Sequence, residues 1–281
     1  MNDAAPLRRI WLCADDYGLS PGVNRAIRDL IERGRLNATS VMVVGPAIGR
    51  DEVSALRSAA ANSPRCAIGL HVTLTAPFRP LTMHFQPLDG GMFPTFPKLL
   101  RGGLLRRLDP EIIHAELRVQ FAAFNEMFGR TPDFVDGHQH VQLFPGVRDA
   151  FLTAVKEAAP DAWVRQSGRN QPLARRLGTP KALFLDILSA QFRSRAARAK
   201  IAFNPGFAGA YHFSQTPDFS TLMRQFLDGL PEGGLIMCHP GFVDEILVSL
   251  DPLTHQREHE YAFLGGGDFP RLLVANKVTL G

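Results

Sequence analysis

Short apolar runs typical of buried strands alternate with amphipathic segments of helical periodicity along most of the chain. After the first run, Ile10 to Ala14, Ser20 can cap a helix and Pro21 suits its first position. Strands that alternate with helices favour a parallel β/α architecture. We predict further strands at residues 39–44, 67–73, 134–138 and 235–239, and helices at 51–61, 110–128, 147–158 and 219–230.

The length of the chain indicates one domain. Its 281 residues, 45% of them apolar, can bury a full core and match the size of a single α/β barrel. No linker divides the sequence, so we predict one domain over residues 1–281. Residues 76–105 break the alternation and are rich in Pro, Gly and Phe, so we expect a loop-rich insertion that walls a substrate site.

The cysteines and the apolar runs bear on the cellular compartment. Cys13, Cys66 and Cys238 are too few and too scattered for a disulfide framework, which indicates a reducing environment. The N-terminal residues lack the apolar core of a secretory signal, and no run reaches the roughly 18 apolar residues that span a bilayer. We therefore expect a soluble, cytoplasmic protein without a transmembrane segment.

The net charge of +4 is accompanied by basic clusters at residues 101–107, 165–176 and 193–200. We interpret these clusters as solvated helix faces, with contact to an anionic partner as the alternative. The chain has three Tyr and two Trp, and no aromatic residues are interleaved with the basic ones. Nucleic-acid binding is therefore not expected.

Acidic and imidazole side chains stand at the ends of the predicted strands. Asp15 and Asp16 end the first strand, where adjacent like charges cost free energy unless a cation or a reaction uses them. His71 and His239 end two later strands. Because α/β enzymes gather metal ligands at several strand ends, the pattern predicts a metal site. The alternatives are a helix cap for one aspartate and structural roles for the two histidines.

A further strand end carries Asp136-Gly137-His138-Gln139-His140. Asp136, His138 and His140 share one face if the segment stays extended. One carboxylate and two imidazoles on the same face favour metal binding.

The motifs of these strand ends are ADDYGLS (14–20), GLHVTLT (69–75), DGHQHV (136–141) and MCHPGF (237–242). Together, and in this order, they resemble those of the YdjC-like family of carbohydrate deacetylases. The resemblance implies a distorted β/α TIM-like barrel. It also implies a metal-dependent enzyme that removes N-acetyl groups from short amino-sugar chains, with one divalent ion, Mg²⁺ or Zn²⁺, as cofactor.

The resemblance also implies roles for individual residues. It assigns the metal ligands to Asp16, His71 and His138, the base to Asp15 and the acid to His239, with His140 and Asp136 supporting the ligands without touching the ion. The sequence departs from the usual family pattern at Tyr17, where Phe is common, at Cys13, where Asn is common, and at Gln142, where a further His is frequent. Because Gln142 stands where the family often has a further histidine, the role of that histidine has no counterpart in this sequence.

The expected activity is hydrolysis of an N-acetyl group on an amino-sugar substrate, either chito-oligosaccharide-like or a sugar-bearing lipid. The expected partner is this small N-acetylated carbohydrate or glycolipid, and a homodimer is one allowed assembly. One alternative is a metal-dependent hydrolase of another bond such as a phosphoester, which would gather more carboxylates, or arginines, beside the metal. Another is a non-catalytic sugar- or lipid-binding protein on the same barrel, against which the retention of Asp15, Asp16 and the histidines argues.

Overall fold

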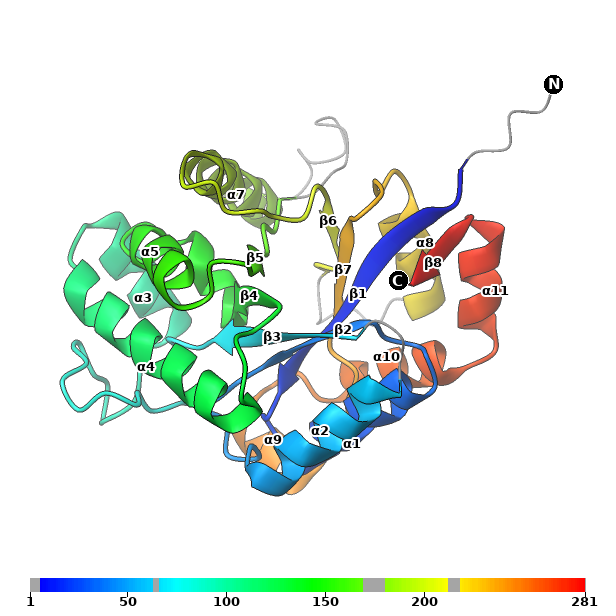
Figure 1. Ribbon diagram of the computed structural model, residues 1–281, viewed down its shortest axis with the longest axis horizontal. Coiled ribbons are helices and arrows are strands. Elements are labelled where there is room, and N and C mark those ends of the chain that lie inside the picture. The colour runs from blue at the N-terminus through cyan, green and yellow to red at the C-terminus, as the bar shows by residue number, and fades with distance from the viewer. Residues whose placement is uncertain (1–5, 63–65, 169–179, 212–217, 281) are drawn as a thin grey trace.

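Strand β1 (Arg8–Tyr17) runs through the middle of a parallel sheet in the computed structural model (Figure 1). The structure describes residues 6–62, 66–168, 180–211 and 218–280. The strand order is β5-β4-β3-β2-β1-β7-β6, and β8 pairs with the start of β1. The other strands are β2 (Ala38–Val41), β3 (Ala67–Val72), β4 (Phe134–Gly137), β5 (Trp163–Val164), β6 (Phe207–Ala208), β7 (Leu235–Cys238) and β8 (Val278–Leu280).

Residues 202 and 203 bridge the two ends of this sheet. Val164 on β5 pairs with Phe203, and its backbone N–H donates to the carbonyl of Ala202 at 2.9 Å. The chain then continues into β6, so the sheet curves into a nearly closed barrel. The predicted fold, a distorted β/α barrel, is confirmed.

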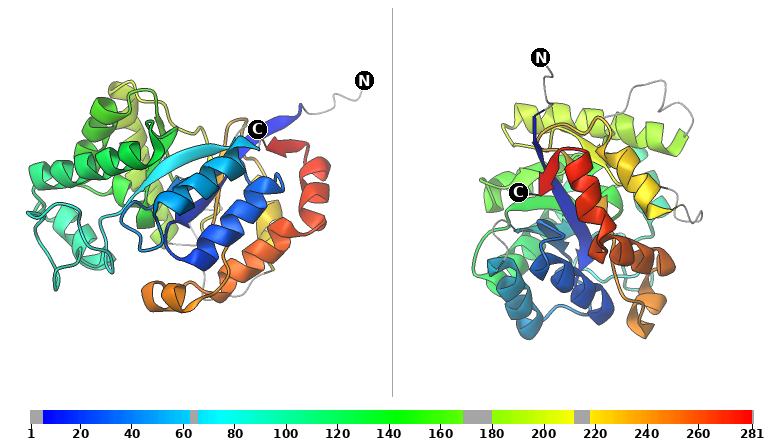
Figure 2. Two further views of the ribbon diagram at one scale, coloured as in Figure 1. Left: turned by 60° about the horizontal axis from the view of Figure 1, so that its bottom comes forward. Right: turned by 90° about the vertical axis from the view of Figure 1, so that its right-hand side faces the viewer.

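Helices surround the barrel, as Figures 1 and 2 show. They are α1 (Pro21–Glu32), α2 (Arg50–Ala61), α3 (Phe96–Leu104), α4 (Pro110–Phe128), α5 (Arg148–Ala158), α7 (Pro180–Arg198), α8 (Phe219–Leu227), α9 (Glu245–Leu250), α10 (His255–Gly265) and α11 (Asp268–Ala275). The 3₁₀ segment η1 (His138–Leu143) follows β4. No helix in the described part of the chain is both long and apolar enough to cross a membrane.

Local sequence explains where several helices begin and end. Ser20 accepts a hydrogen bond from the Val23 N–H and caps α1, as predicted. Asp109 caps α4, and Gly129 ends that helix at a φ of +66°, a conformation that favours glycine. The predicted bounds of α4 therefore agree with the structure.

The barrel interior is lined by small, aliphatic and aromatic side chains. Its buried members are Cys13, Ala38, Ala67, Phe134, Phe207, Leu235 and Met237. Phe134 stacks on Trp163 with 4.6 Å between ring centroids. Gly69 leaves room for the Phe134 ring, because a Cβ at residue 69 would lie 2.6 Å from that ring. Cys13 and Asp15 are two residues apart on β1 and lie on the same face of the strand. The Cys13 Sγ lies 3.6 Å from Asp15 Oδ1, so the carboxylate is next to the interior layer.

Several predictions about the chain need correction. The strand predicted at 39–44 ends at Val41, and the helix predicted at 219–230 ends at Leu227. The predicted strand at 134–138 ends at Gly137, because the chain turns into η1. The basic cluster at 165–176 is not a solvated helix face at its start, since Arg165 is buried. Its residues from 169 onward lie outside the described residues.

Candidate active site

The predicted site residues meet at the carboxyl ends of the strands, around a cavity of about 800 Å³. Asp15 and Asp16 lie at the end of β1, His71 lies near the end of β3, and His239 directly follows β7. All four line the cavity together with His138. Phe96 of α3 also lines it, so the insertion at 76–105 contributes to its wall.

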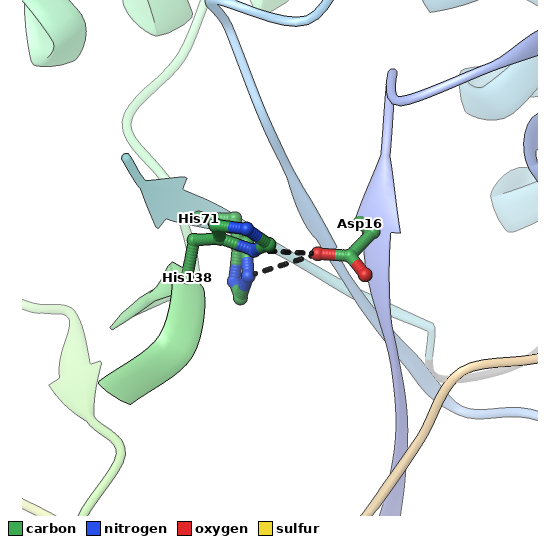
Figure 3. Close-up of side chains that lie close together, drawn as sticks. All are labelled: Asp16, His71 and His138. Atoms are coloured by element: carbon green, nitrogen blue, oxygen red, sulfur yellow. Dashed lines mark hydrogen bonds and ion pairs between the residues drawn. The ribbon is translucent and has the colours of Figure 1, made fainter. Parts of the chain in front are cut away.

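Asp16, His71 and His138 form a compact cluster (Figure 3). The Asp16 Oδ1 lies 3.3 Å from His71 Nε2 and 3.0 Å from His138 Nδ1. The ligand atoms of all three residues lie within 4.8 Å of one another. One carboxylate oxygen and two imidazole nitrogens suit a divalent ion, and three protein ligands leave positions open for water and substrate. The donor set therefore fits the expected metal.

Asp136 supports one imidazole of this cluster. Its Oδ1 lies 2.6 Å from His71 Nδ1, and the Ser40 hydroxyl lies 3.0 Å from the same nitrogen. A carboxylate behind a ligating histidine fixes its ring and makes the other nitrogen more basic. Asp136 lies beside His71, and its role as a support of the ligands stays a prediction.

Asp15 is bound by a buried arginine that the sequence prediction did not include. The Arg165 guanidinium donates to Asp15 Oδ2 at 2.8 Å and to Oδ1 at 2.7 Å, and it also contacts Asp136. Burial alone would raise the pKa of Asp15, but Arg165, with the nearby His71, outweighs it and holds that pKa below its usual range. Asp15 is therefore ionised at neutral pH.

A second group of possible ligands is formed by Cys13, Asp15 and Asp136, whose ligand atoms also lie within 4.8 Å of one another. Arg165 already supplies the positive charge between the two carboxylates. Burial raises the pKa of the Cys13 thiol, which therefore stays protonated. This group is a salt-bridge network and not a cation site.

His239 reaches the cavity from a well-anchored backbone. Its N–H donates to Glu260 Oε2 at 2.5 Å, and the Tyr211 hydroxyl donates to Glu260 Oε1 at 2.6 Å. Glu260 is buried and belongs to α10. The position of His239 is thus fixed by a helix that sequence analysis did not connect with the site.

His140 lines the same cavity as His138, but not through an extended strand. Gln139 and His140 have φ angles of +54° and +58°, in the left-handed region, so the segment is not extended there. His140 Nδ1 lies 3.0 Å from the Ser167 hydroxyl, and its ring packs edge-on against Phe207. Burial lowers the pKa of His140 to about 4. The residue is therefore neutral at pH 7, and its support of the ligands stays a prediction.

Arg257 is the other functional candidate that the sequence prediction missed. It is 0% exposed, and its Nη2 donates to Asp16 Oδ2 at 2.6 Å and to Asp251 Oδ2 at 2.7 Å. Arg165 and Arg257 lie 150 and 241 residues from the aspartates they bind. Arg165 directly follows β5 and Arg257 lies on α10. The sequence carries no local signal for such contacts, because arginine is usually solvated.

The fold and the cluster define an α/β-barrel protein with a candidate divalent-metal site at its strand ends. A family model described as YdjC-like protein matches residues 9–275, and the chain belongs to this family.

Solved structures share the fold at low sequence identity. One, described only provisionally as a cellobiose-phosphate cleavage protein of Enterococcus faecalis V583, has a TM-score of 0.74 and 19% identity, covering 98% of this chain and 97% of its own. A lactam utilization protein from Thermus thermophilus has a TM-score of 0.51 and 16% identity, covering 97% and 98%. An uncharacterized Agrobacterium tumefaciens C58 protein also reaches 0.51, at 13% identity, covering 99% and 88%.

Proposed function

We propose that this protein is a metal-dependent deacetylase that hydrolyses the N-acetyl group of an amino-sugar or of a sugar-bearing lipid. The observation that carries the proposal is one cavity lined by a metal-type cluster, by the ionised Asp15 and by the imidazole of His239. Hydrolysis of an amide needs a group that takes a proton from water and a group that gives one to the departing nitrogen. Membership of the YdjC-like family supports the same activity.

The proposed roles follow from what each side chain can do. Asp16, His71 and His138 would hold the ion, Mg²⁺ or Zn²⁺, which polarises an amide carbonyl and makes a neighbouring water more acidic. Asp15 accepts the proton of the attacking water, and Arg165 keeps this carboxylate ionised and oriented. His239 donates a proton to the leaving nitrogen. Acetate and a free amine are the products.

The buried arginines help to decide between the proposed reaction and phosphoester hydrolysis. Phosphoester hydrolysis favours guanidinium groups that face the substrate. Arg165 and Arg257 lie beside the cluster, but they are 1% and 0% exposed and are bound to Asp15 and Asp16. Arg165 is not part of the cavity wall, whereas Arg257 lines the cavity with its Nη2 bound to Asp16 and Asp251. Because two carboxylates already compensate the charge of Arg257, this arrangement favours the amide as substrate.

The test is a substrate panel with matched metal states. Purified protein is stripped with a chelator, dialysed and assayed with and without added Mg²⁺ or Zn²⁺. The panel contains N-acetylated chito-oligosaccharides, an N-acetylglucosaminyl lipid and p-nitrophenyl phosphate. We expect one free amine for each acetate released, loss of this activity after chelation and its return with the ion.

Matched variants link the activity to the cluster. His71→Ala should be inactive. His114→Ala should be active, because it removes an imidazole of α4 that pairs with Glu157 at the surface. Phosphate release without acetate would establish the phosphoesterase alternative. Sugar binding without either product would establish a binding protein.

A further inference from the structure

Arg257 of α10 is fixed on several sides. Its Nη2 bonds Asp16 and Asp251, and its Nε donates to the Leu253 carbonyl at 3.0 Å. A guanidinium that is 0% exposed is stable in the folded protein only when such partners compensate for lost hydration. Its position is therefore set by the fold and not by solvent.

The two oxygens of Asp16 have separate partners. Oδ1 faces His71 Nε2 and His138 Nδ1, and Oδ2 faces Arg257 Nη2. The backbone of Asp16 has a φ of +68°, in the left-handed region that non-glycine residues seldom adopt. Such a conformation persists only where the surroundings hold it, and Arg257 is the cationic residue that holds this side chain.

The motif that carries His239 also makes room for Arg257. The Gly241 N–H donates to the Arg257 carbonyl at 3.1 Å, and a Cβ at residue 241 would lie 3.2 Å from Arg257 Cδ. One helical turn further along α10, Glu260 accepts the His239 N–H. Helix α10 thus fixes a metal-ligand candidate and an acid candidate from the same side.

We propose that Arg257 is a positioning residue that binds one oxygen of Asp16, leaves the other oxygen for a divalent ion and thereby raises the affinity of the site for that ion. This inference rests on the proposed function, because it takes Asp16 as a ligand. Charge alone predicts the opposite sign, since a guanidinium near a cation weakens its binding. The direction of the change in affinity therefore separates positioning from simple electrostatics.

The experiment titrates chelator-stripped protein with Mg²⁺ and with Zn²⁺ by calorimetry, and repeats each titration as a shift in melting temperature. Arg257→Met keeps the length of the stem and removes the guanidinium. We expect binding about 10- to 100-fold weaker than in the wild type, the usual cost of losing a group that orients a ligand. Arg148→Met is the matched control, because it removes a buried guanidinium of α5 that bonds Gln191. This control should bind the ion like the wild type.

Two further variants ensure that the titration can still support or overturn the proposal. Arg257→Lys retains the charge but not the fork of donors, and positioning predicts that it does not restore affinity. If Arg257→Met does not fold, Arg257→Gln decides, because it removes the positive charge and keeps a side chain that can donate a hydrogen bond. Weaker ion binding by Arg257→Gln supports the proposal, and unchanged or tighter binding overturns it.

The outcomes also separate this inference from the proposed function. If the wild type binds the ion and Arg257→Met binds it equally well or more tightly, positioning by Arg257 is wrong and the proposed ligands stand. If the wild type binds no divalent ion, the metal-dependent function fails and the inference fails with it.

Discussion

Arg165 gives Asp15 a fixed orientation by binding both of its oxygens. Asp15→Asn removes the charge but keeps the shape, so we expect the variant to retain its ion and to lose roughly 10²-fold or more in kcat, the usual scale of general-base catalysis. It should also melt at a lower temperature, because buried Arg165 keeps only Asp136 as a charged partner. Metal content and kcat are measured below that temperature. Loss of the ion would instead make Asp15 a ligand.

The role of His239 is tested by the leaving group. His239→Ala should keep fold and ion, be slow on an amide whose amine leaves poorly, and be much less impaired on an activated acetyl ester that needs no protonation. The measurement is the ratio of kcat/KM on the two substrates. An equal loss on both at an unchanged melting temperature argues against acid catalysis. A large fall in melting temperature favours a structural histidine.

At the level of single residues, the sequence predicted those candidate site residues that belong to motifs at the ends of strands. Asp16, His71 and His138 could be grouped because parallel strands end at the same side of a barrel. Arg165 and Arg257 could not, since their contacts depend on tertiary structure and arginine is usually a surface residue. The extended segment that would place His140 on the face of Asp136 and His138 does not form, because two consecutive residues there adopt positive φ.

Among the elements, the insertion at 76–105 is anchored by one buried carboxylate. Glu116 of α4 accepts from the backbone N–H groups of Leu81 and Thr82 and from the Thr82 hydroxyl. The same insertion carries Phe78, whose ring packs edge-on against the candidate ligand His138. The anchor therefore links α4 to the wall of the site.

Replacement of this carboxylate by an amide should loosen the insertion. Glu116→Gln places an NH₂ group against donors, so we expect a loss of about 1–3 kcal/mol in the free energy of unfolding and faster proteolysis within the insertion. Urea denaturation and limited proteolysis check this. Glu126→Gln, at an exposed position of the same helix, is the control and should match the wild type. Equal stability of the two variants would contradict the proposed anchor.

Elements with signals at both ends were predicted best. Helix α4 has Asp109 before it and Gly129 after it, and its predicted bounds agree with the structure. Strands β5 and β6 have two residues each, and only pairing with distant strands defines them. Helix α10 was not predicted, although its side chains bind both the metal-ligand candidate Asp16 and the acid candidate His239. Its role depends on side-chain contacts with distant segments.

For the whole molecule, ion binding should appear as stability. A ligand that binds only the folded state at 100 times its Kd adds about 2.7 kcal/mol to the free energy of unfolding. We therefore expect the melting temperature of the stripped protein to rise as Mg²⁺ or Zn²⁺ is added, and this rise to vanish in His71→Ala and His138→Ala. Scanning calorimetry with and without chelator measures it. Full metal occupancy in both variants would disprove the ligand assignment.

The central place of β1 has a consequence for how the chain is made. During synthesis β1 leaves the ribosome well before β7, the strand that pairs with one of its two edges. Cys238 of β7 lies 225 residues beyond Cys13 of β1. At roughly 5–20 residues per second, that edge stays open for about 11–45 s. An apolar strand with an open edge is a template for pairing with other chains. The rate of translation and the supply of chaperones should therefore influence how many nascent chains become folded barrels.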